Sequence, residues 1–307
     1  MHEHIQRALY YFEIHLLFAS IVWCAAWMLT LIGRGSATTK YWIWVATLLN
    51  FILPLGALFD KLLAAHLSWA TPIGLIGGAG VGIAQNAPAA ALWSLGAALM
   101  LTRLCLRMRA DRRDAKTAAG QHTRDSSPSF RVQGITVSFA GRRQAPAVDG
   151  VWRPRILLPD GIDRLLSRRE LDAVLIHELT HARRRDNLIR LVHEVVLCLL
   201  WFHPLVWITG ARLALFRELS CDESVIESAH GGDLVSALAK LADPEEAFLL
   251  RASASSFLMN RLPRLMAVQP QPTSRPRSTL LVVLFGAVLL TCVLGTVSHT
   301  ACCFISK

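Results

Sequence analysis

Long apolar stretches alternate with polar, mostly basic stretches along this 307-residue chain. A helix needs roughly 20 predominantly apolar residues to cross a bilayer, because it rises about 1.5 Å per residue. Four stretches reach or approach that length and are predicted to be transmembrane helices. They run from about Ile14 to Ile32, Trp42 to Phe59, Ala89 to Leu106 and Thr279 to Val297.

Basic residues are distributed unevenly around these stretches. Arginine and lysine are concentrated after the first and third stretches and before the fourth, whereas the loop from Asp60 to about Pro88 has only Lys61. Cytoplasmic loops carry the excess of basic residues, so both termini are predicted outside and the middle region in the cytoplasm. The predicted organisation is a membrane region (1–107) with three spans, a cytoplasmic domain (108–278), and a fourth span with a short outer tail (279–307).

Composition supports this interpretation. Apolar residues make up 53% of the chain and charged residues 18%, against roughly 25% charged residues in soluble domains. The formal net charge of +10 would also suit a nucleic-acid-binding protein. Such a protein gathers its basic residues on a folded face, whereas here many of them flank apolar stretches. We therefore expect the lipid bilayer to be a partner and expect no direct nucleic-acid binding.

The middle region combines strand and helix signals. A polar linker from Asp111 to Pro128 is predicted to be disordered. Phe130–Phe139 and Arg155–Leu158 are rich in β-branched or aliphatic residues and are each predicted to form a strand. Ser167, three residues before a glutamate, fits a capping box and predicts that a helix begins there. These signals predict an α+β domain.

The predicted helix leads into His177-Glu178-Leu-Thr-His181. Histidines four residues apart lie on one helix face, so their imidazoles can bind one metal ion. The intervening Glu178 can act as a general base without being a ligand, as in the HExxH arrangement of zinc peptidases. A five-residue match also arises by chance, as two surface histidines beside a glutamate.

A catalytic zinc site generally has a third protein ligand and one open position. Glu218 is the best candidate for the third ligand, and Asp222, one helical turn later, could orient a ligating histidine. Three alternatives stay open for the third ligand: Cys221, Glu223 and Glu194.

Four segments in this order resemble the BlaR/MecR-type membrane metallopeptidases, the antirepressor family of bacterial antibiotic sensing. The segments are Arg153–Pro159, His177–Asp186, Trp201–Trp207 and Arg217–Glu223. The resemblance implies a mainly α membrane protein with four transmembrane helices and a cytoplasmic α+β gluzincin-like zinc peptidase domain. It implies His177, His181 and Glu218 as zinc ligands and Glu178 as the base.

The resemblance also implies a multi-pass protein of the bacterial cytoplasmic membrane that cleaves a transcriptional repressor or itself. Relatives that sense β-lactams carry a penicillin-binding domain after the fourth span. Here only residues 298–307 follow, so we do not expect direct β-lactam acylation. Two alternatives are an HtpX-like quality-control protease and a non-catalytic receptor that retains the zinc fold. A homo-oligomer also stays open.

The apolar segment from Leu188 to Gly210 is constrained by this ligand set. If it crossed the membrane once, Glu218 would lie on the opposite side from His177. The segment is therefore predicted to fold back, with a bend near Pro204 and its neighbouring tryptophans. Two histidines in the segment, His193 and His203, are predicted to be partly buried structural residues rather than oxyanion-stabilising groups.

Overall fold

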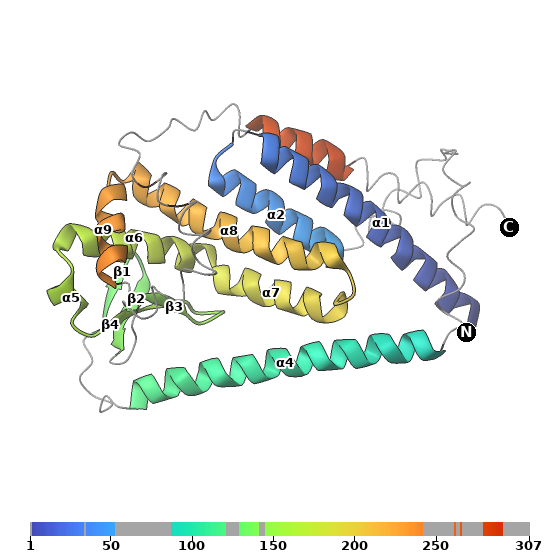
Figure 1. Cartoon of the computed structure of the whole chain (residues 1–307), viewed down its shortest axis with the longest axis horizontal. Coiled ribbons are helices and arrows are strands. Elements are labelled where there is room, and N and C mark those ends of the chain that lie inside the picture. The colour runs from blue at the N-terminus through green and yellow to red at the C-terminus, as the bar shows by residue number, and fades with distance from the viewer. Residues whose placement is uncertain are drawn as a thin grey trace.

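The computed structural model describes residues 2–33, 35–52, 87–120, 129–140, 145–241, 261, 265 and 279–290. These residues are mostly helical, with a four-stranded sheet at one end of a helical bundle (Figure 1). The helices are α1 (His2–Ile32), α2 (Ala37–Ile52), α4 (Ala87–Gly120), α5 (Ile162–Leu165), α6 (Arg168–Arg184), α7 (Asp186–Leu199), α8 (Pro204–Glu227), α9 (Gly231–Leu241) and an apolar helix over Thr279–Leu290.

The sheet differs from its prediction in two respects: the predicted strand Phe130–Phe139 is a hairpin of two strands, and a further strand over Ala147–Asp149 was not predicted. The chain turns at Gln133 and Gly134, whose φ angles of 51° and 85° are typical of tight two-residue hairpin turns. The strand order is β1-β2-β4-β3, with β2 and β4 parallel and the other pairs antiparallel. The strands are β1 (Ser129–Val132), β2 (Ile135–Ala140), β3 (Ala147–Asp149) and β4 (Arg155–Pro159).

The helix that carries the HExxH motif begins as predicted. Ser167 caps α6 by accepting a hydrogen bond from the backbone N–H of Glu170, and the Glu170 carboxylate accepts one from the backbone N–H of Ser167. The helix ends at Arg184. The next residue, Arg185, has a left-handed conformation (φ 57°) and directly precedes α7. The chain therefore changes direction directly after the motif, and Asp186 is turned back towards it.

Helices α7 and α8 form a helical hairpin, which confirms that the chain folds back. Helix α7 ends at Leu199, and Pro204 occupies the first turn of α8, where its missing N–H costs no helical hydrogen bond. The backbone N–H of His203 donates to the Leu200 carbonyl across the bend (2.9 Å). Trp207 donates to the Trp201 carbonyl (2.8 Å), so tryptophans lie at the bend as expected.

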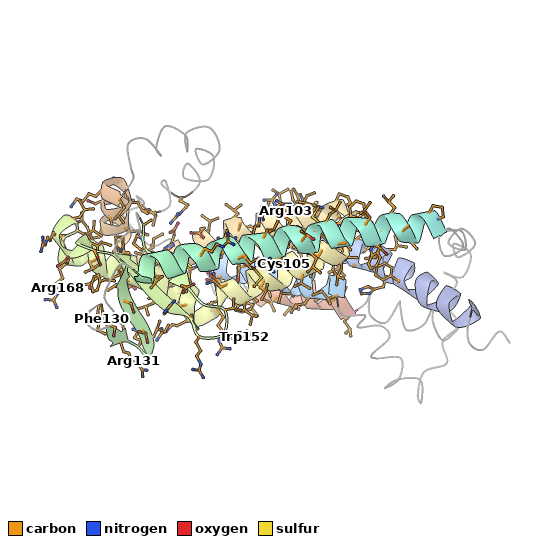
Figure 2. All side chains as sticks on the ribbon, turned by 90° about the horizontal axis from the view of Figure 1, so that it is seen from below. Arg103, Cys105, Phe130, Arg131, Trp152 and Arg168 are labelled. Atoms are coloured by element: carbon orange, nitrogen blue, oxygen red, sulfur yellow. The ribbon has the colours of Figure 1, made fainter. Side chains whose placement is uncertain are left out.

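Within the described residues, two helices are long and apolar enough to cross a membrane. They are the segments His15–Ile32 of α1 and Ala90–Ala110 of α4, in the first and third predicted spans. Only 6% of the α4 segment is buried, against 28% for α1, so α4 presents apolar side chains that no described residue covers. Figure 2 shows α4 running along the length of the molecule with side chains projecting from it.

The other predicted spans are described only in part. Helix α2 has 16 residues, and the helix over Thr279–Leu290 is also shorter than a full span. Residues 53–59 and 291–297 lie outside the described residues. The predicted linker from Asp111 was wrong in its first part, because α4 continues to Gly120; residues 121–128 are not described.

Two principal hydrophobic cores meet along α8. One lies between α1, α2, α7 and α8 and includes Trp44, Leu48 and Phe216. The other joins the sheet to α6, α8 and α9 and includes Ile156 and Val225. Because α8 contributes to both cores, it fixes the bundle relative to the sheet, and the segment between its two core regions reaches α6.

Candidate metal centre

Helices α6 and α8 bring three metal-binding atoms together. His177 and His181 lie four residues apart on α6, and their Nε2 atoms are 3.2 Å apart. Glu218 on α8 places Oε2 3.5 Å from the first Nε2 and 3.8 Å from the second. The structure therefore brings together the three residues that the sequence predicts as ligands.

The triangle of these atoms has the dimensions of a zinc site. Zinc binds histidine nitrogen at about 2.0–2.1 Å with tetrahedral angles, so two of its ligand atoms lie roughly 3.3 Å apart. The separations of 3.2, 3.5 and 3.8 Å between the three atoms lie close to this value. Two histidines and one glutamate would leave the fourth position open, as in catalytic zinc sites. The residues present thus fit the metal that the sequence implies.

Cys221 is also close enough to be considered as a third ligand, since a ligand atom from each of His177, His181 and Cys221 lies within 4.8 Å of the other two. Its Sγ, however, contacts Nδ1 of His181 (3.4 Å), and Asp186 already occupies that nitrogen at 2.7 Å. A metal shared by the two histidines lies on their Nε2 side, where Glu218 is placed. The arrangement therefore favours Glu218.

The other two candidates for the third ligand make contacts elsewhere. Glu223 accepts hydrogen bonds from the start of α2, and Glu194 lies 3.7 Å from the Arg107 guanidinium. Neither is among the residues that line the cavity at the histidines.

Each histidine has a carboxylate on its Nδ1 side. Nδ1 of His177 lies 3.3 Å from Asp222 Oδ1, which is the placement predicted for a residue that orients a ligand. Nδ1 of His181 hydrogen-bonds Asp186 Oδ2 at 2.7 Å. This second carboxylate is not among the site residues predicted from the sequence. Its position five residues after His181 could have signalled the contact, because the left-handed Arg185 turns it back.

Each of these carboxylates is held by a bidentate arginine. Arg184 donates to both oxygens of Asp186 at 2.7 Å, and Arg261 donates to both oxygens of Asp222 at 2.7 Å. Burial raises the pKa of both carboxyl groups, but the histidine and arginine beside each lower it below its usual range. Both aspartates are therefore ionised and can accept hydrogen bonds from the imidazoles.

Negative charge surrounds the histidines and favours a cation between them. Burial lowers the pKa of the His181 imidazole, but contacts with Asp186, Cys221 and Glu218 outweigh it and raise the pKa to about 12. Burial raises the pKa of the Glu218 carboxyl, yet His177 and His181 hold it well below its usual range. A divalent metal ion would replace these protons as the positive charge at the site.

Glu178 lines the same cavity as the three converging residues. The cavity has a volume of about 240 Å³ and is bordered by β3 and by the first residues of α7. Burial raises the pKa of the Glu178 carboxyl, and the two histidines oppose that shift. A partly buried carboxylate that lines such a cavity is suited to exchange protons with a reacting water.

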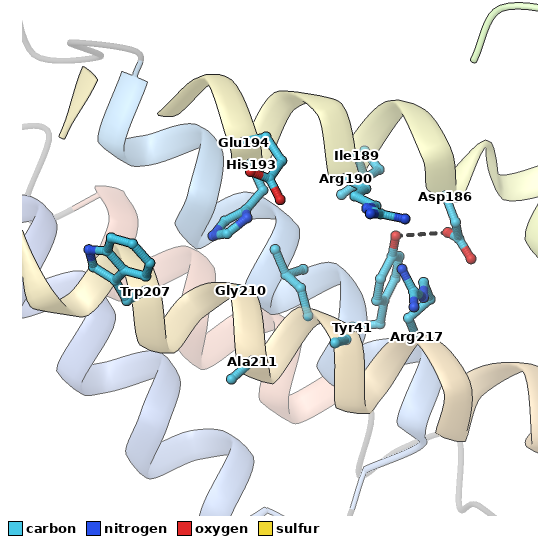
Figure 3. Close-up of a pocket in the computed structure, with 12 residues that line it drawn as sticks. Tyr41, Asp186, Ile189, Arg190, His193, Glu194, Trp207, Gly210, Ala211 and Arg217 are labelled. Atoms are coloured by element: carbon cyan, nitrogen blue, oxygen red, sulfur yellow. Dashed lines mark hydrogen bonds between the residues drawn. The ribbon is translucent and has the colours of Figure 1, made fainter. Parts of the chain in front are cut away.

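A second cavity, of about 330 Å³, lies between α2, α7 and α8 (Figure 3). It shares Asp186, Arg190 and Arg217 with the site cavity. His193 lines it and hydrogen-bonds the Val206 carbonyl through Nε2 (3.0 Å). His203 lies at the bend of the hairpin against Phe51, with ring centroids 5.3 Å apart. Neither histidine lines the site cavity, consistent with structural roles.

Comparison with known proteins identifies the region that carries the site. Residues 84–235 match the family model described as BlaR1 peptidase M56. The regulatory protein BlaR1 of Bacillus licheniformis is 30% identical over 175 residues, which cover 54% of this chain and 28% of that protein. The methicillin resistance mecR1 protein of Staphylococcus aureus is 26% identical over 102 residues, covering 33% and 17%. The matched regions are thus well under half of these relatives' own length.

Proposed function

Since residues 84–235 carry a peptidase domain of the BlaR/MecR type, we propose that the chain is a membrane-bound zinc metalloendopeptidase in signal transduction. The observation that carries the proposal is the convergence of Nε2 of His177, Nε2 of His181 and Oε2 of Glu218 within 3.8 Å. These atoms are the proposed zinc ligands, in a gluzincin-type site.

The residues around the ligands have distinct roles in the proposed reaction. Zinc bound there would act as a Lewis acid towards the scissile carbonyl. Glu178 takes a proton from the attacking water and delivers it to the leaving amine as the peptide bond breaks. Asp186 and Asp222 hold the imidazoles in the tautomer that leaves Nε2 free to bind the metal.

The substrate is proposed to bind as an extended chain beside β3. This strand is an edge of the sheet, and its residues Ala147 and Val148 line the site cavity. An edge strand offers unpaired backbone groups to a peptide. Such binding recognises the backbone of the bound peptide more than its side chains, which suits a protein substrate.

The membrane arrangement is proposed from the apolar helices and the basic loops together. Helices α1 and α4 supply two candidate spans, and α2 and Thr279–Leu290 would complete four with residues that are not described. The distribution of basic residues supports outer termini and a peptidase domain on the cytoplasmic side. The helical hairpin of α7 and α8 keeps Glu218 on that side with His177.

The cellular substrate is proposed to be a cytoplasmic transcriptional repressor or the chain itself. The two relatives are a regulatory protein and a methicillin resistance protein, which supports a role in a regulated response rather than in general proteolysis. A signal from outside the cell would switch cleavage on.

Replacing Glu178 with Gln tests the proposal. The variant keeps the ligands but loses the base, so it should retain zinc and lose cleavage by a factor of roughly 10²–10⁴ or more. Newly formed protein N-termini in cells expressing the parent, but not Glu178→Gln, would identify substrates, including the chain itself. Glu227→Gln, the same change at an exposed position of α8, is the matched control and should cleave like the parent. Cleavage that persists in Glu178→Gln would contradict the role, and absence of zinc from the parent would favour a non-catalytic receptor.

A further inference from the structure

Helix α2 reaches the metal centre through one side chain. Tyr41 is 1% exposed, and its hydroxyl donates a hydrogen bond to Asp186 Oδ1 at 2.8 Å (Figure 3). The other oxygen of that carboxylate hydrogen-bonds Nδ1 of His181 at 2.7 Å. Two hydrogen bonds therefore connect a helix of the N-terminal region to the imidazole of a proposed zinc ligand.

The ring of the same tyrosine supports the arginine that holds Asp186. The Arg184 guanidinium carbon lies 4.1 Å from the centroid of the Tyr41 ring, within the range of cation–π contacts. Arg184 in turn donates to both oxygens of Asp186. Tyr41 thus contacts both members of the ion pair, one through its hydroxyl and the other through its ring.

Helix α2 is also fixed to the ligand-bearing helix α8. The Glu223 carboxylate, five residues after Glu218, accepts hydrogen bonds from the backbone N–H groups of Ala37 (3.2 Å) and Thr38 (3.1 Å). The Thr38 hydroxyl donates to the same carboxylate (3.0 Å). A carboxylate at a helix N-terminus satisfies N–H groups that have no partner within the helix. The position of Tyr41, one turn later, is therefore set by α8.

Packing alone does not fix the Asp186 carboxylate. Tyr41 and Asp186 both line the cavity of about 330 Å³ between α2, α7 and α8, so one side of their contact borders this cavity. In Figure 3 the Tyr41 side chain extends from α2 along this cavity towards α7. Two hydrogen bonds, one from the Tyr41 hydroxyl (2.8 Å) and one from Nε of Arg184 (2.7 Å), hold this oxygen of the carboxylate in place.

We propose that Tyr41 is a positioning residue for the zinc ligand His181, acting through Asp186, and that it couples the placement of α2 to metal binding. The inference rests on the proposed function, because it assigns His181 to the zinc site. It adds that the candidate metal centre depends on a helix outside the segment that holds the motifs. A shift of α2 would therefore change the position of the ligand His181.

Zinc affinity of the full chain tests the inference. All variants carry Glu178→Gln to prevent self-cleavage, are purified in detergent, and compete for zinc with a chelator of known affinity. Tyr41→Phe removes the hydroxyl but keeps the ring, and should weaken zinc binding roughly 3–10-fold, less than the roughly 10–100-fold typical of direct partners of a ligand. Thr47→Val is the matched control, because it removes another buried hydroxyl of α2, whose one hydrogen bond among the described residues is to the Ile43 carbonyl (2.8 Å).

The outcomes separate positioning from a general loss of stability. The inference predicts weaker zinc binding for Tyr41→Phe alone, with similar unfolding temperatures for the two metal-free variants. Equal zinc affinity in Tyr41→Phe and Thr47→Val would overturn it, even if both unfold earlier than the parent. If the parent chain binds no zinc, the proposed function fails. If the parent binds zinc but Tyr41→Phe binds it as tightly as Thr47→Val does, this inference alone fails.

Discussion

Each histidine of the candidate metal centre has a carboxylate beside its Nδ1 atom, but the two contacts differ in length. On one side, Asp186 hydrogen-bonds Nδ1 of His181 at 2.7 Å and is itself held by Arg184 and Tyr41. On the other side, Asp222 lies 3.3 Å from Nδ1 of His177. That nitrogen has no hydrogen-bond partner among the described residues, although it is buried.

The arginines do not account for this difference, because each carboxylate is held at both oxygens at 2.7 Å, Asp186 by Arg184 and Asp222 by Arg261. Asp186 lies at the turn between α6 and α7 and is brought to His181 by the backbone itself. We infer that His181 is oriented before the metal binds, whereas His177 is oriented by the metal together with Asp222.

The largest expected effect comes from removing the two aspartate charges separately. Asp186→Asn should weaken zinc binding by roughly 10–100-fold, as is typical for a residue hydrogen-bonded to a metal ligand. Asp222→Asn should weaken it less, because the existing contact is longer and poorly directed. Chelator competition on the full chain with Glu178→Gln measures both.

Folding has to be followed in the same variants, since each change leaves an arginine without its carboxylate, and breaking a buried ion pair costs about 3–5 kcal/mol. Both variants share this cost, so comparable unfolding temperatures leave the difference in zinc affinity interpretable. An effect of Asp222→Asn as large as that of Asp186→Asn would refute the asymmetry.

A smaller effect is expected on the thiol beside the tighter support. Cys221→Ser keeps a small polar group near Nδ1 of His181, where Asp186 already makes the stronger contact. Zinc affinity should change by less than about threefold, since the removed group is a weak donor and acceptor. A loss on the scale expected for Asp186→Asn would show that the sulfur binds the metal and that the assignment of Glu218 is wrong.

The parts of the site that follow local rules could be predicted from the sequence. The spacing of His177 and His181 fixes their common face, and the capping box at Ser167 fixes where their helix begins. The requirement that Glu218 share a side with His177 predicted the fold-back of α7 and α8. Each of these rests on helix geometry or on one topological constraint.

The parts that depend on tertiary contacts could not be predicted. Nothing near Tyr41 in the sequence indicates a contact with Asp186, 145 residues later. Asp222 was expected beside a histidine, but its tight pairing with Arg261 was not. The difference between the 2.7 Å contact at His181 and the 3.3 Å contact at His177 is therefore not visible in the sequence.

Two elements were missed for local reasons. The hairpin within Phe130–Phe139 depends on positive φ angles at Gln133 and Gly134, and only the glycine signals them. The continuation of α4 to Gly120 was taken for a disordered linker because the segment is highly charged. Its alanine, lysine and arginine residues are nonetheless strong helix formers.

X-ray absorption spectroscopy at the zinc edge, on the full chain carrying Glu178→Gln, tests the central claim most directly. We predict about one zinc per chain with a shell of nitrogen and oxygen ligands at about 2.0–2.1 Å and no sulfur. Glu218→Gln should lower zinc occupancy, because it removes the charged ligand. A sulfur ligand at about 2.3 Å would instead assign Cys221 to the metal, and a chain that binds no zinc would contradict the account as a whole.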